Sequence, residues 1–176
     1  MSAVGSIIII GGGASGILLA AHLLRRSDAR RQVTIVEKRG QLGRGLAFSA
    51  ERPQHILNVP AANMSAYADE PDHFRRWLSR THPELPGDPF LFAPRSTNGE
   101  CLSDVLQLWE AAADEKTCVS TVSSAAVGIR PRDKGVEIHL ADGTVRFGTR
   151  RRVKGCDAVD LQRGLRPAGE RGMSTA

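Results

Sequence analysis

The chain has 176 residues and a formal net charge of +5 at pH 7, with 41% hydrophobic and 24% charged residues. This is the composition of an ordinary globular protein with one domain and a real core. Its three cysteines (Cys101, Cys118 and Cys156) form no C-x-x-C pair, which argues against a disulfide framework or a zinc site and favours a reducing cytoplasm.

The first predicted element lies in residues 7–24, "IIIIGGGASGILLAAHLL". A signal peptide needs a positively charged start, and the preceding residues "MSAVGS" carry no Lys or Arg. Glycines and a histidine interrupt the apolar run, which is also at the short limit for a membrane span. We therefore interpret the segment as the opening of a nucleotide-binding fold.

Each part of the segment has a mechanical role in that fold. Residues 7–10 form a β-branched strand, residues 11–16 match G-x-G-x-x-G, and apolar residues at helical spacing follow. Gly11 allows the tight turn, Gly13 leaves room for a pyrophosphate, and Gly16 lets the helix pack closely on the strand. The helix N-terminus then offers free N–H groups to phosphates. A structural glycine turn that binds nothing is the alternative.

A second β-branched strand, residues 32–37, ends at Glu37, which lies 21 residues after Gly16. This position predicts a carboxylate that accepts hydrogen bonds from ribose hydroxyls. Its charge argues against NADP, although Lys38 and Arg39 follow, and leaves NAD and FAD. Residues 40–65 show no sustained hydrophobic period, which indicates a long functional loop. In a simple NAD domain, alternating helices and parallel strands would continue here.

Four blocks, in order, carry a resemblance to a known family: "IIIIGGGASGILLAAHLLRR", "VTIVEKRGQLGRGLAFSA", "HILNVPAANMSAYADEPDHFRRWL" and "FAPRSTNGECLSDVL". Together with residues up to about 145, they resemble the N-terminal part of a bacterial family of FAD/NAD(P)-binding flavoproteins. That family includes flavin-dependent urate hydroxylases and an aspartate N-monooxygenase. Asn98 and Cys101 depart from it, because the family tends to have aromatic residues there.

The resemblance implies an α/β, Rossmann-like FAD/NAD(P)-binding fold with a three-layer ββα arrangement and an inserted β-meander, incomplete at the C-terminus. It also implies that the 43–45 segment continues the FAD site, that an arginine lies near the pyrophosphate, and that the backbone near Val127 contacts the adenine. The candidate cofactor residues are Gly11, Gly13, Ala14, Ser15, Gly16, Glu37, Lys38, Gly43, Arg44, Gly45, Arg95 and Val127.

Further elements follow from the hydrophobic pattern alone. An amphipathic helix is predicted over residues 72–81 after an Asp cap, an extended run over 88–96, and a second helix over 99–115. Residues 118–147 alternate apolar and polar residues with turns at 132–135 and 142–143, which predicts a β-meander. Trp109 is predicted to lie in the core.

The pattern changes near residue 147, which divides the chain into a partial FAD/NAD(P)-binding domain (1–147) and a tail (148–176). Residues 144–176 carry eight Lys or Arg and three acids, so they account for the whole net charge. We expect this tail to be disordered or out of frame. A basic arm at residues 146–154 for nucleic acid or acidic lipid is a weaker alternative.

The sequence thus predicts an FAD-binding oxidoreductase domain, similar to flavin monooxygenases and present as an N-terminal fragment. NAD(P)H would be the co-substrate of a full-length relative, and FAD would supply the chemistry. No catalytic residue, metal ligand set or substrate is predicted, and neither membrane nor nucleic-acid partners are expected. A non-catalytic dinucleotide-binding module and an inactive fragment remain alternatives.

Overall fold

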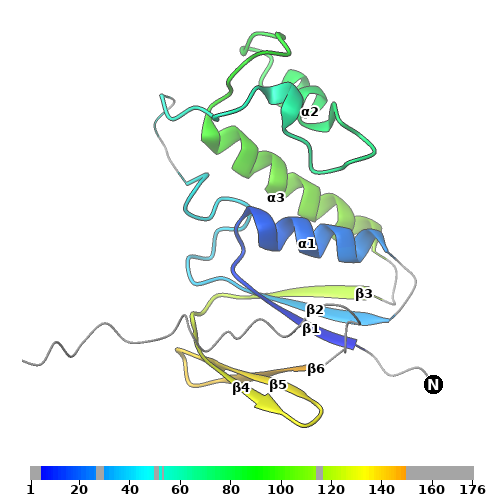
Figure 1. Cartoon of the computed structure of the whole chain (residues 1–176), viewed down its shortest axis with the longest axis vertical. Helices are drawn as coiled ribbons and strands as arrows, with labels where there is room; N and C mark the ends of the chain where they lie inside the picture. Colours follow the sequence, from blue (N-terminus) through cyan, green and yellow to red (C-terminus); the bar gives the residue numbers. More distant parts are fainter. Residues whose placement is uncertain (1–4, 27–29, 50–51, 53, 114–116, 150–176) are drawn as a thin grey trace, which may run out of the picture.

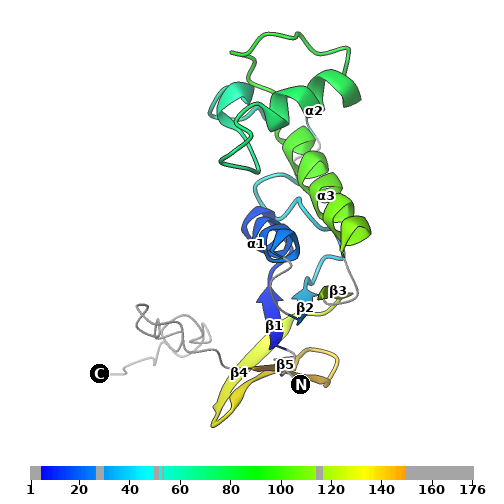
Figure 2. The same cartoon turned by 90° about the vertical axis from the view of Figure 1, so that its right-hand side faces the viewer.

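The computed structural model describes residues 5–26, 30–49, 52, 54–113 and 117–149. Its centre is a parallel sheet, with helices on one face and an antiparallel sheet on the other (Figure 1). The view turned by 90° shows these three layers edge-on (Figure 2). The predicted ββα arrangement is therefore confirmed.

The glycine-rich opening forms one β-α-β unit, as the sequence predicts. Strand β1 (Gly5–Ile10) leads into helix α1 (Ala14–Arg25), and strand β2 (Arg31–Val36) returns beside β1. The two strands are parallel, with Ile7 opposite Val33 and Ile9 opposite Ile35. Runs of β-branched residues suit such strands, because both faces of a parallel sheet are covered.

Strand β3 (Thr117–Val122) corrects the sequence prediction for residues 118–122. It pairs in parallel with β2, so it belongs to the central sheet and not to the meander. An alternating strand pattern describes which residues face each way, but it does not specify the partner strand. The sheet order is β1-β2-β3, and β2 therefore has a neighbour on each side.

The helical layer packs on one face of this sheet through α1 and α3 (Arg95–Ala112). Helix α3 begins four residues before the predicted start, directly after Pro94, whose ring favours extended backbone in the preceding residue. Alternate residues of β1 and β2 face the helices, as a period of two requires. The buried core of this layer comprises Ile9, Ile17, Ala20, Leu24, Val33, Ile35, Leu102 and Leu106.

The opposite face is covered by the meander of β4 (Ala126–Arg132), β5 (Gly135–Leu140) and β6 (Val145–Thr149). Val36 is buried against Ile138 and Leu140 there. Strand β6 also reaches β1, because the Ser6 N–H donates to Thr149 Oγ1 at 3.0 Å and Ser6 Oγ donates to the Phe147 carbonyl at 3.0 Å. These bonds connect the two sheets at their ends.

A third cluster forms around the far end of α3, where α2 (His73–Thr81) and the short η1 turn (Ala61–Asn63) lie (Figure 1). The predicted helix over 72–81 is confirmed, with Asp72 at its N-cap position. Phe74, Trp77 and Leu78 are its buried residues. Trp77 Nε1 donates to Asp104 of α3 at 2.9 Å, which fixes the two helices to each other.

The predicted boundary at residue 147 falls close to the end of β6, and the tail from residue 150 lies outside the described residues. Among the described helices, none is both long and apolar enough to cross a membrane.

Candidate dinucleotide site

The three parallel strands bring their carboxyl ends to one edge of the sheet, where ligands bind in folds of this type. The Gly11 N–H donates to the Val36 carbonyl at 2.8 Å, which ties the loop after β1 to the end of β2. The Glu37 N–H donates to the Val122 carbonyl at 3.0 Å, which ties the end of β2 to β3. The candidate residues after β1 and β2 therefore lie side by side.

The glycine loop has the backbone that its sequence predicts. Gly11 has a φ of +100°, a conformation that side chains disfavour. A Cβ on Gly16 would lie 2.0 Å from the Gly11 carbonyl oxygen, so the first turn of α1 packs directly on the loop. No side chain caps the N-terminus of α1. In such a first turn the N–H groups of Ala14, Ser15 and Gly16 have no intrahelical acceptor, which is the arrangement that favours an anion.

The Glu37 carboxylate is buried and holds this loop in place. Its Oε2 accepts the Gly12 N–H at 2.7 Å, and its Oε1 accepts the Arg39 N–H at 2.9 Å. Each oxygen of an ionised carboxylate has two acceptor positions, so both oxygens keep one for another donor. Lys38, the neighbouring candidate, is exposed.

The segment from Gly43 to Gly45 lies against the glycine loop, although 30 or so residues separate the two in sequence. Gly43 N–H donates to the Gly12 carbonyl at 2.8 Å. Gly43 and Gly45 have φ values of +83° and +52°, and a Cβ on Gly45 would lie 3.1 Å from the Gly13 Cα. Gly13 and Gly45 thus bring two stretches of backbone side by side with no side chain between them, and we call this surface the cradle.

Helix α3 supports this cradle from behind. Ser103 Oγ donates to the Leu42 carbonyl at 2.7 Å. A Cβ on Gly43 would lie 2.5 Å from the Gly99 carbonyl oxygen, and one on Gly99 would lie 3.0 Å from the Cγ of Arg44. Arg44 therefore runs along the first turns of α3, where its guanidinium lies 3.6 Å from Glu100.

Two other candidates lie elsewhere in the fold, one at the start of α3 and one in the meander. Arg95 is the first residue of α3, and its Nε donates to the Ile56 carbonyl at 2.9 Å while its N–H donates to the His55 carbonyl at 2.8 Å. Val127 is 59% exposed and falls at an irregularity in the pairing of β4 with β5. Ala126 opposes Leu140 and Gly128 opposes His139, so Val127 is an extra residue in the ladder.

Sequence reasoning missed Gly12, Gly99 and Ser103 as parts of the site. Gly12 lies in the motif at a position without an assigned role, and the sequence pattern predicts only a helix start at Gly99. A glycine inside a helix costs about 0.5–1 kcal/mol relative to alanine, so its presence signals a close approach. Ser103 gave no signal, because a polar residue on a helix is ordinary.

Apart from this cradle, few features of the described residues indicate a catalytic or metal site. They contain no cluster of three or more metal-ligating side chains. Burial raises the pKa of the Cys101 thiol to about 12, which keeps it protonated and unreactive. A hollow of about 460 Å³ lies between the central sheet and β6, away from the glycine loop, with Gln32, Thr34 and Arg146 in its lining.

A family model described as FAD-NAD(P)-binding matches residues 8–153, which is more than half of the chain. The chain belongs to this FAD/NAD(P)-binding family. Members of this family bind FAD and NAD(P). This agrees with the dinucleotide-binding glycine loop and with the resemblance seen in the sequence.

Among characterised proteins, the chain is 30% identical to "Salicylate hydroxylase asL1" of Sarocladium schorii, over 87% of this chain and 35% of that protein. Two solved structures share the fold. The FqzB structure has a TM-score of 0.52 at 11% identity, covering 82% of this chain and 34% of that one. The Diels-Alderase PyrE3 of pyrroindomycin biosynthesis has a TM-score of 0.50 at 18% identity, covering 82% and 31%. The chain thus spans about a third of the length of the relatives it matches.

Proposed function

We propose that residues 5–149 form the FAD-binding part of a flavin-dependent oxidoreductase related to monooxygenases. The observation that carries the proposal is the backbone cradle at Gly13 and Gly45, open to the N-terminus of α1 and adjacent to Glu37. A family match to FAD/NAD(P)-binding proteins and a salicylate hydroxylase relative support it.

In this proposal the FAD diphosphate binds at the glycine loop. Gly11, Gly13 and Gly16 allow the close approach, and the N–H groups of Ala14, Ser15 and Gly16 donate to the phosphate oxygens. The α1 dipole and the lack of an acidic residue in its first turn favour an anion there.

Around the diphosphate, other residues of the chain bind the rest of the cofactor. Glu37 accepts the ribose hydroxyls with the positions left free on its oxygens. Gly43, Gly45 and the guanidinium of Arg44 border the diphosphate from the opposite side, and Arg95 lies at the start of α3. The backbone at Val127 contacts the adenine, which the irregularity in β4 supports. Lys38 lies beside Glu37 at the solvent side of the ribose.

Bound FAD supplies hydride and oxygen chemistry that no protein side chain provides. The described residues provide binding, orientation and a positive electrostatic environment, and we assign none of them as an acid or base. We propose NAD(P)H as the co-substrate of the whole protein and a small molecule as its substrate. The free thiols of Cys101 and Cys118 support a reducing, cytoplasmic location.

The test is a titration of FAD against the wild type and Gly13→Val. We expect the dissociation constant to rise at least about tenfold in the variant, because the valine side chain occupies the cradle that the diphosphate needs. Gly87→Val is the matched control, since Gly87 is exposed and a Cβ there meets nothing within 4 Å. If Gly13→Val binds FAD as the wild type does while remaining folded, the glycine loop is not the binding site.

A further inference from the structure

A row of charged side chains runs from the candidate diphosphate cradle to the end of α2. Arg44 lies 3.6 Å from Glu100 Oε1, and the other oxygen of Glu100 lies 3.1 Å from His82 Nε2. The second ring nitrogen of His82, Nδ1, lies 3.1 Å from Glu84 Oε1. Glu100 is therefore shared between an arginine of the cradle and a histidine outside it.

Arg44 has little freedom in its backbone. It lies between two glycines with left-handed backbone, one of which bonds to Gly12, and its Cγ packs on Gly99. The backbone of Arg44 therefore lies beside the cradle, and its guanidinium lies near Glu100. Its reach to a ligand depends on how strongly Glu100 attracts it.

The two contacts of Glu100 differ in kind. The distance of 3.1 Å to His82 is a hydrogen bond, whereas 3.6 Å to Arg44 is an ion pair beyond hydrogen-bond length. Glu100 thus lies beside Arg44 without forming a hydrogen bond to its N–H donors. A diphosphate can then accept those donors in the paired geometry that arginine favours.

Two carboxylates face the ring of His82, one at each nitrogen. A neutral imidazole donates from one nitrogen only, whereas an imidazolium donates from both. The two carboxylates at 3.1 Å therefore fit the protonated form. When the ring loses its proton, one of these contacts becomes a repulsion between two acceptors.

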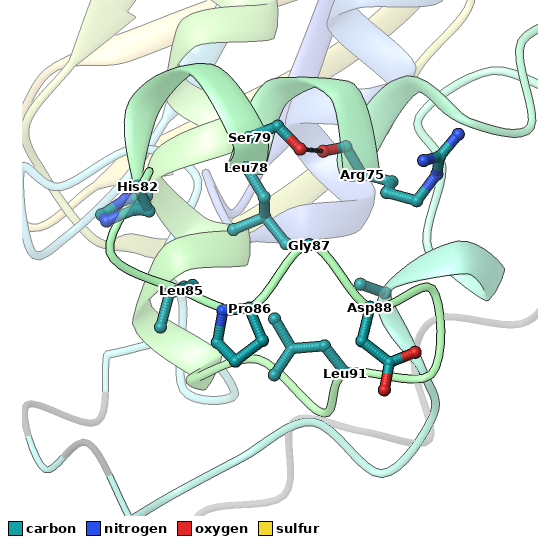
Figure 3. A pocket seen from close by; sticks show the side chains of 10 residues that line it. Arg75, Leu78, Ser79, His82, Leu85, Pro86, Gly87, Asp88 and Leu91 are labelled. Atoms are coloured by element: carbon teal, nitrogen blue, oxygen red, sulfur yellow. Dashed lines mark hydrogen bonds between the residues drawn. The ribbon is translucent and has the colours of Figure 1, made fainter.

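Several other charged groups surround His82. It caps the C-terminus of α2 and lies at one end of a small hollow, which Arg75 of α2 and Asp88 of the following loop also line (Figure 3). Across from it on α3, Asp104 accepts the Trp77 indole N–H, and the Trp77 ring lies 5.5 Å from the His82 ring. The side chain of His82 is 21% exposed, so it can exchange protons with solvent.

We propose that His82 is a positioning residue for the diphosphate, which holds Glu100 away from Arg44 so that Arg44 binds the ligand. Without a charged His82, Glu100 has one cationic partner left and closes onto Arg44, where it competes with the diphosphate. This competition weakens dinucleotide binding whenever the imidazolium is lost. The inference rests on the proposed FAD site.

The experiment measures FAD dissociation constants from pH 5.5 to 8.5 on the full chain, for the wild type, His82→Gln, Glu100→Gln and the double variant. For the wild type we expect affinity to fall about tenfold over this range, the order expected from one charge-assisted hydrogen bond. His82→Gln is expected to bind weakly at every pH. Glu100→Gln and the double variant are expected to bind tightly at every pH, because the competing carboxylate is gone.

Glu110→Gln serves as the matched control, because it removes the same charge from the same helix without contact to Arg44. It should keep the wild-type affinity and pH profile. Thermal unfolding of each variant confirms that it is folded, and the wild-type pH profile tests the proposal without any substitution.

The proposal is overturned if wild-type affinity does not change with pH, or if the double variant binds as weakly as His82→Gln. The second result would mean that His82 acts on the fold and not through Glu100. The FAD site itself is judged separately, by the loss of binding in Gly13→Val. A wild type that binds no FAD at any pH overturns both proposals.

Discussion

At the scale of single residues, the glycines of the loop divide into two kinds. An added Cβ on Gly13 would make an ordinary contact, 3.4 Å from the Gly45 Cα, whereas an added Cβ on Gly16 meets a carbonyl oxygen at 2.0 Å. Both positions are glycine in the motif, but Gly13 is predicted to leave room for the ligand, whereas Gly16 lets α1 pack on the loop. Substitutions should separate these roles.

We expect Gly16→Ala to lower the free energy of unfolding by about 1–3 kcal/mol or more, because the methyl group forces α1 away from the loop after β1. Chemical denaturation monitored by circular dichroism measures this change. Gly87→Ala is the control, since its Cβ would meet open space. Equal stability of Gly16→Ala and the wild type would contradict the close packing seen here.

Glu37 combines both roles in one side chain, because it accepts the Gly12 N–H and lies where ribose hydroxyls are expected. Glu37→Ala should weaken FAD binding by about 1–3 kcal/mol, the usual loss when a charged acceptor is removed. Isothermal titration with FAD gives the value, with Glu110→Ala as the control. An unchanged affinity would remove Glu37 from the site.

At the scale of elements, the parts that sequence predicts well are those whose signals are local. The unit from β1 to β2 follows from consecutive periods and a glycine motif, and α2 follows from apolar residues at helical spacing. Residues 118–122 were placed in the wrong sheet, because pairing with β2 involves residues more than 80 positions away. The contact of Glu100 with His82 depends on how α2 packs on α3, which neither helix specifies alone.

Tyr67, in the long loop between β2 and α2, contacts both α1 and α3. Trp109 Nε1 donates to Tyr67 Oη at 2.7 Å, and the guanidinium of Arg25 lies 5.1 Å from the Tyr67 ring centroid. Trp109 is half-buried and packs against two of the core clusters. The prediction that it lies in the core is therefore confirmed in part.

Tyr67→Phe keeps the ring but leaves the Trp109 N–H without its acceptor. We expect the free energy of unfolding to fall by about 1–2 kcal/mol, the cost of losing the partner of a partly buried donor. The midpoint of urea denaturation reports the change, and FAD affinity should stay as in the wild type because Tyr67 lies outside the cradle. A variant as stable as the wild type would show that this bond does not hold the loop.

At the scale of the whole molecule, three layers enclose β2, which has a neighbour on each side. A parallel sheet needs cover on both faces, and the helices and meander supply it. The described residues therefore contain a more complete FAD-binding core than the sequence suggested, since β3 was not recognised as a central strand.

One glycine-rich loop can hold one dinucleotide, and glycines 164, 169 and 172 do not reproduce the G-x-G-x-x-G motif. We expect the polypeptide of residues 1–176 to bind FAD without reducing it when NADPH is added. Anaerobic absorption spectra of the flavin band measure this, and dithionite serves as the control that the bound flavin is reducible. Rapid bleaching by NADPH would show that the chain has a second nucleotide site.

The bonds between Ser6 and Thr149 also govern how the chain folds. They join residues 143 positions apart, so β1 is synthesised early but acquires its last neighbour only after β6 has formed. Contacts of such long range slow folding, because the entropy of closing the loop is lost before the contact forms. The apolar strand β1 therefore spends the longest time without its full set of neighbours, and this interval is when the nascent chain is most prone to aggregate.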